Sequence, residues 1–71
     1  MKEEKKIAIE QMREGLGKAM KTPISDEEWE NLLFGWRHQT GKQKAYTDKG
    51  WLGLNDAQSL EEYAGYQMIN Q

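Results

Sequence analysis

The sequence lacks cysteine altogether and has a single histidine and a single proline among its 71 residues. Without cysteine there are no disulfides, no thiolate metal sites and no cysteine nucleophiles. One histidine, His38, excludes a metal site built on a histidine pair and leaves little room for a catalytic triad. We find no other catalytic or cofactor motif, so the sequence predicts a non-enzymatic protein with neither a metal nor a cofactor.

Long hydrophobic runs are also missing. The longest run, Leu32 to Phe34, is far too short to span a membrane. The charged residues 1–6 are not followed by the apolar segment of a secretory signal. We therefore expect a cytoplasmic protein without a membrane partner, located in the host-cell cytoplasm if it is phage-encoded. Since a chain of this length builds only a small core, a larger protein partner or a homodimer could supply further buried surface.

Charge is divided unevenly along the chain. Residues 22–35 carry four acids and no base, whereas residues 36–50 carry four bases and one acid. The net charge of −2 therefore conceals a basic middle stretch. The negative total still disfavours a strong free-standing DNA-binding protein, because non-specific affinity for DNA comes mostly from neutralised phosphates.

Hydrophobic spacing predicts an all-α fold, a small bundle of three to four short helices in one domain over residues 1–71. The first helix is predicted over residues 2–20, where Ile9 and Met12 begin a stripe at helical spacing. Pro23 should separate this helix from the next one, because the residue before a proline avoids the helical region.

The second helix is predicted over residues 26–38, and its start has the strongest local signal in the sequence. Ser25 and Glu28 form a capping box, in which the serine hydroxyl accepts from the Glu28 N–H and the glutamate side chain reaches back. Ile24 and Trp29 occupy the two positions of a hydrophobic staple around the same cap.

The rest of the chain is predicted as a loop with a short helix or turn over residues 39–58, followed by a helix over residues 60–70. Within the loop, the short helix or turn is expected near residues 47–54. Ser59 to Glu62 repeats the capping-box pattern and would open the last helix. The predicted core consists of Trp29, Leu33, Trp36, Trp51, Leu54, Leu60 and Tyr63.

Two kinds of residue indicate a protein-binding surface. Acids gather at the start of the second helix, and several apolar side chains fall outside the main hydrophobic stripes. Apolar anchors with a charged rim are typical of protein interfaces. Helix capping also explains the acids, and Phe34 would equally fit a core packed against a second neighbour. The predicted protein-binding residues are Glu27, Glu28, Glu30, Phe34, Tyr66 and Ile69.

Basic residues over positions 37–49 predict an alternative, nucleic-acid-binding surface. They are interleaved with Thr40, Tyr46 and Thr47, whose hydroxyl groups could contact phosphates. A solvated basic loop would show the same pattern. The predicted nucleic-acid-binding residues are Arg37, His38, Lys42, Lys44 and Lys49.

Short motifs in the second half of the chain carry a resemblance to a known family. The run Leu33-Phe34-Gly35-Trp36-Arg37 is followed by Gly41-Lys42, Tyr46-Thr47, Leu54 and a final Tyr66-Gln67-Met68-Ile69-Asn70-Gln71. In this order, residues 32–71 resemble the C-terminal helical module of DnaD-like phage replication proteins. The resemblance implies a phage or mobile-element origin, a role near DNA-handling machinery, and DNA contacts at Arg37, Lys42 and Lys44.

Two functions follow as expectations. The first is a protein-binding accessory or inhibitor, of phage or mobile-element type, that acts on a nucleic-acid-handling or defence protein. The alternative is a DNA-binding replication-type module that uses the basic residues 37–49. Charge reversal at Lys42 and Lys44 should abolish DNA binding, whereas Phe34→Ala or Tyr66→Ala should weaken protein binding.

Overall fold

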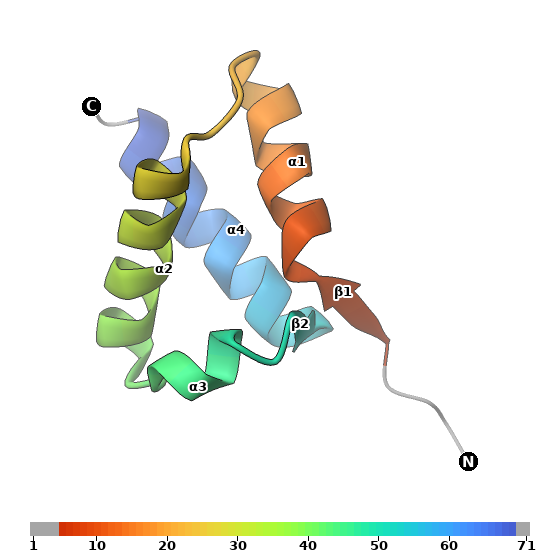
Figure 1. Cartoon of the computed structure of the whole chain (residues 1–71), viewed down its shortest axis with the longest axis vertical. Helices are drawn as coiled ribbons and strands as arrows, with labels where there is room; N and C mark the ends of the chain where they lie inside the picture. The colour runs from red at the N-terminus through yellow and green to blue at the C-terminus, as the bar shows by residue number, and fades with distance from the viewer. Residues whose placement is uncertain (1–4, 70–71) are drawn as a thin grey trace.

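The chain is folded mostly into helices. The computed structural model describes residues 5–69, and this part contains four helices and two short strands (Figure 1). The predicted class, a small helical bundle, is confirmed, and a two-stranded antiparallel sheet adds to it. In chain order the elements are β1 (Lys6–Ala8), α1 (Ile9–Met20), α2 (Asp26–Thr40), α3 (Lys44–Thr47), β2 (Trp51–Gly53) and α4 (Leu54–Ile69).

The N-terminal segment forms a strand where the sequence predicts a helix. β1 pairs with β2, with Ile7 opposite Leu52, and the N–H of Ile9 donates to the carbonyl of Gly50 at 3.1 Å. α1 therefore begins at Ile9, which corrects the predicted start at residue 2. Residues 2–4 of that prediction lie outside the described residues. Pairing with a segment far along the chain overrides the local helical preference here.

The start of α2 confirms the predicted cap. The Oγ of Ser25 accepts from the N–H of Glu28 at 3.1 Å. The two staple residues, Ile24 and Trp29, are each 4% exposed. An N-terminal cap and a staple need only residues close together in sequence, so the sequence alone could predict where α2 begins.

The segment predicted as a loop over residues 39–58 is more ordered than expected. α2 continues past residue 38 to Thr40 and is followed by Gly41, whose φ of +76° is the left-handed conformation common after a helix. α3 follows, with Gln43 at its N-cap, which corrects the short helix or turn expected near residues 47–54. Most of that expected stretch is instead a turn at Gly50 and the strand β2.

The last helix begins earlier than predicted. α4 starts at Leu54 rather than at residue 60, so the second predicted capping box is wrong. Ser59 lies inside the helix, and its Oγ accepts from the indole Nε1 of Trp36 at 3.0 Å. The hydroxyl group serves a tertiary contact instead of a cap. α4 ends at Ile69, and residue 70 lies outside the described residues.

α4 runs through the middle of the molecule. α1 and α2 both pack against it, and the two strands contact it near its N-terminal end (Figure 1). Tyr63 and Trp51 are half-buried and Leu54 is 48% exposed, so these three predicted core residues lie outside the fully buried set. The predicted core residues that are buried are Trp29, Leu33, Trp36 and Leu60, joined by the unpredicted Leu52.

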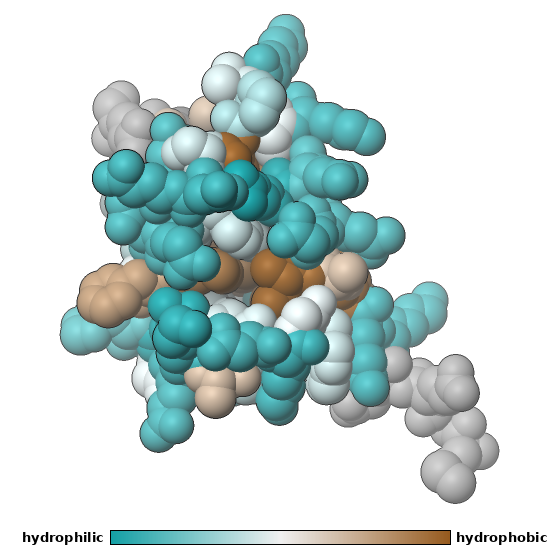
Figure 2. All heavy atoms as spheres, viewed as in Figure 1, coloured by the Kyte–Doolittle hydropathy of each residue, from teal (hydrophilic) through white to brown (hydrophobic). Residues whose placement is uncertain are grey.

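The surface is mainly hydrophilic. Figure 2 shows a band of hydrophobic atoms across the middle of one face, enclosed by hydrophilic side chains, and a hydrophobic group projecting at the α2 end of the band. Within residues 5–69, no helix combines the length and the apolar character that crossing a membrane requires.

Candidate interaction surfaces

One side of α2 carries an aromatic side chain between charged groups. Phe34 is 67% exposed, so it is a surface residue and not part of the core. Its ring stacks on His38, with ring centroids 6.4 Å apart and an angle of 6° between the planes. Glu27, Glu30 and Asn31 are also exposed and share this side by helical spacing. We call these five residues the outer α2 face.

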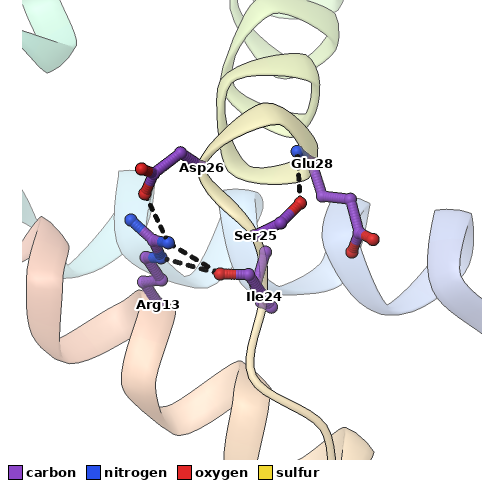
Figure 3. A network of polar contacts seen from close by, with 5 residues as sticks. All are labelled: Arg13, Ile24, Ser25, Asp26 and Glu28. Atoms are coloured by element: carbon purple, nitrogen blue, oxygen red, sulfur yellow. Dashed lines mark hydrogen bonds and ion pairs between the residues drawn. The ribbon is translucent and has the colours of Figure 1, made fainter.

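The acidic start of α2 borders a groove. The carboxylate of Glu28 turns away from Ser25, so only the serine half of the predicted capping box forms (Figure 3). Glu28 instead lines a groove of about 340 Å³ between α2 and α4, together with apolar side chains such as Leu32. Glu27, Glu28 and Glu30 are all exposed, and within residues 5–69 no ion pair engages their carboxylates.

Arg13 connects α1 to the same end of α2. Its Nη2 donates to the carbonyl of Ile24 and to the carboxylate of Asp26, both at 2.7 Å, and its Nε donates to the same carbonyl at 3.2 Å (Figure 3). The guanidinium therefore engages the first acid of α2, Asp26, and not the three glutamates.

The other two predicted protein-binding residues lie on α4. Tyr66 is 67% exposed. Ile69 is the last residue of α4, and its side chain lies outside the described part of the chain. Tyr66 and Phe34 are thus two exposed aromatic residues on helices that pack against each other.

The predicted nucleic-acid-binding residues do not form one surface. Arg37 is only 8% exposed, and its Nη1 donates to Thr47 Oγ1 at 2.7 Å. Its guanidinium joins α2 to α3 inside the protein, which corrects its prediction as a phosphate contact. Lys44 lies at the surface but pairs with Asp48 at 3.1 Å, while His38 belongs to the outer α2 face.

Lysine and aromatic side chains come together where α3 meets the sheet. The Nζ atoms of Lys42 and Lys49 lie 4.5 and 5.0 Å from the ring centroid of Tyr46. Lys49 Nζ is also 5.5 Å from the centroid of Trp51, and Lys6 Nζ from β1 lies 4.1 Å from that ring. We call these five residues the lysine–aromatic surface.

Sequence reasoning missed two members of this surface. Trp51 was predicted to lie in the core. Its closeness in sequence to Lys42, Tyr46 and Lys49 could have indicated a place in this surface. Lys6 had no local signal, because it reaches Trp51 only through the pairing of β1 with β2. Asp56 is an acid in contact with this cluster: it accepts from the Tyr46 hydroxyl, and its carboxylate lies 3.9 Å from Lys42 Nζ.

Neither metal-binding side chains nor comparisons with known proteins point to a further site in the described residues. Within residues 5–69, histidine, aspartate and glutamate side chains nowhere gather in a group of three or more that could hold a metal ion. Comparisons with protein-family models, curated proteins and solved structures return no match. The resemblance to the DnaD-like module stays a prediction.

Proposed function

We propose that the protein is a small, non-enzymatic protein-binding accessory or inhibitor that docks through the outer α2 face. Phe34 carries this proposal, because it is a large aromatic side chain that is 67% exposed on a helix of the bundle. Aromatic anchors surrounded by polar groups contribute most of the affinity in many protein interfaces. The stacking of Phe34 on His38 supports the role, since a ring already held in place loses less conformational freedom on binding.

The charge of this region indicates the chemistry of the partner. Glu27 and Glu30 place two exposed carboxylates on the same side of α2 as Phe34, and Glu28 adds a third at the border of the neighbouring groove. Such a cluster favours a partner with a basic surface around an apolar pocket. A nucleic-acid-handling protein meets this description, because the groove that accepts phosphates is basic. The carboxylates would then lie where phosphates otherwise bind, which is the action of an inhibitor.

The biological setting of the proposal comes from the sequence. The resemblance of residues 32–71 to a phage replication module favours a phage or mobile-element origin and a replication or defence protein as the partner. The two proteins are proposed to meet in the cytoplasm.

A photocrosslinking experiment tests the docking face directly. Asn31, which lies between Glu27 and Phe34 on the outer α2 face, is replaced by p-benzoylphenylalanine, and the purified protein is irradiated in an extract of its source cells. The captured partner is identified by mass spectrometry, purified and titrated with parent protein and with Phe34→Ala. We expect Phe34→Ala to weaken binding about tenfold or more. The unfolding midpoint should shift little, because the ring is largely exposed.

A matched pair of charge variants separates the proposed face from general acidity. The first replaces Glu27, Glu28 and Glu30 by glutamine. The control replaces Glu14, Glu61 and Glu62, which are exposed elsewhere, and changes the net charge by the same amount. We expect only the first variant to lose affinity for the captured partner. Equal affinities of both variants, or an unaltered affinity of Phe34→Ala, would refute docking through this face.

A further inference from the structure

The lysine–aromatic surface opens onto a cavity. The charged and aromatic residues that line this cavity, of about 440 Å³, are Lys5, Tyr46, Lys49, Trp51 and Asp56. Trp51 and Tyr46 are both half-buried, so each ring is supported by the protein and still presents part of its surface outward. Lys49 Nζ lies within 5.5 Å of both ring centroids and therefore bridges the two rings.

Among the described residues, positive charge predominates around these rings. Lys5, Lys6, Lys42 and Lys49 surround them, and the nearby carboxylate of Asp56 is engaged by Tyr46 and Lys42. The acidic start of α2 lies toward the opposite end of the molecule from the sheet (Figure 1). The negative net charge of the chain is thus not the charge of this surface.

We propose that the lysine–aromatic surface binds a short segment of single-stranded nucleic acid, with bases stacked on Trp51 and Tyr46 and phosphates held by the lysines. Non-specific single-strand binding combines these two elements, a basic path for the backbone and aromatic rings for the bases. Contacts between lysines and exposed rings are weak. A phosphate can therefore draw the ammonium groups away from the rings, and the rings are then free to stack on a base.

A single strand fits this surface better than a duplex does. Bases within a duplex are stacked on one another and present no free face to Trp51. Base edges in the major groove are read by an inserted helix or by bidentate side chains such as arginine. α3 spans four residues, and Arg37 is buried against Thr47. Neither of them is available to read a duplex at this end of the protein.

Fluorescence anisotropy with three labelled probes tests the proposal. The probes are oligothymidylate of about 12 nucleotides, oligouridylate of the same length and a hairpin duplex of mixed sequence. We expect both single strands to bind more tightly than the duplex. Three or four phosphate contacts predict a slope of about −2 to −3 when log affinity is plotted against log salt concentration.

Variants with matched charge changes locate the site. Lys6→Gln with Lys49→Gln removes two charges from the surface, and Lys18→Gln with Lys21→Gln removes two from the far end of α1. We expect the first pair to reduce oligothymidylate affinity about tenfold or more and to flatten the salt slope by about 1.4. The second pair should change the affinity less than about twofold.

Changes at Trp51 separate stacking from charge. Trp51→Leu, which leaves all charges in place, should weaken binding about fivefold or more, whereas Trp51→Phe should retain most of the affinity. Circular dichroism and the unfolding midpoint establish that each variant is folded, and the Lys6 and Lys49 variant tests the site if Trp51→Leu unfolds.

Four outcomes would overturn the proposal. They are no binding of any single strand at about 50 mM salt, tighter binding of the duplex than of the single strands, equal losses in the two lysine variants, and competition by poly-glutamate that equals competition by unlabelled oligothymidylate. The last result would identify an acidic protein as the ligand. Because the outer α2 face is not involved, each result is independent of the proposed protein-binding function.

Discussion

The two ends of α2 are held in place by different kinds of contact. At its start, Ser25 caps the helix through Glu28, and Ile24 and Trp29 are buried together in the core beside this cap. These partners are near neighbours in sequence, and Arg13 of α1 adds bonds to Ile24 and Asp26 at the same end. Toward its end, Trp36 bonds to Ser59 in α4 and Arg37 bonds to Thr47 in α3, so the partners come from other elements.

This difference extends to the two proposed interaction surfaces. The outer α2 face follows from helical spacing along one element, and Phe34 could be named as an anchor from the sequence. The lysine–aromatic surface needs β1, α3 and β2 together, so Lys6 reaches Trp51 only after the sheet has paired. Local patterns thus indicate one surface, and tertiary pairing creates the other.

Among the substitutions that test this difference, the removal of Arg37 should cause the largest loss of stability. Arg37→Ala deletes a buried charged hydrogen bond to Thr47 and the packing of the side-chain stem, so we expect a loss of about 2–3 kcal/mol in the free energy of unfolding. Lys44→Ala, at an exposed ion pair, should cost less than about 1 kcal/mol. Urea unfolding followed by circular dichroism measures both. Equal losses would mean that Arg37 is a surface group like Lys44.

The two serines that share a capping pattern should respond differently to glycine. Glycine is acceptable at an N-cap, so Ser25→Gly should lower the free energy of unfolding by about 0.3 kcal/mol. Ser59→Gly places glycine inside α4 and removes the acceptor of the Trp36 indole, so the expected loss is about 1–2 kcal/mol. The urea midpoints of the two variants measure these losses. A larger loss for Ser25→Gly than for Ser59→Gly would contradict the assignment of Ser59 to a tertiary contact.

Two helical glycines should give effects of opposite sign. A methyl group at Gly35 would overlap the hydroxyl of Tyr63, whereas at Gly15 it would meet no atom within 4 Å. Gly35→Ala should therefore destabilise the protein by about 1 kcal/mol, since the overlap outweighs the gain in helix propensity. Gly15→Ala should stabilise it by up to about 1 kcal/mol. The thermal midpoints test this, and a gain at both positions would show that Tyr63 moves aside freely.

Sequence reasoning succeeded where a signal lay within one or two turns of helix. The all-α class, the cap at Ser25 and the burial of Trp29 and Trp36 were all predicted from spacing. It failed where the same residue types serve a distant partner. Ser59 looked like a second cap, and Arg37 looked like a phosphate contact, although both side chains bond to other elements.

By itself the sequence determined the all-α class and where α2 begins, because helix periodicity and caps depend on neighbours a few residues apart. The tertiary structure alone decided the strand at Lys6–Ala8, the early start of α4 and the union of Lys6 with Trp51. Strand pairing has a partner far along the chain, and its register depends on which faces the helices bury. The lysine–aromatic surface exists only in the folded protein for this reason.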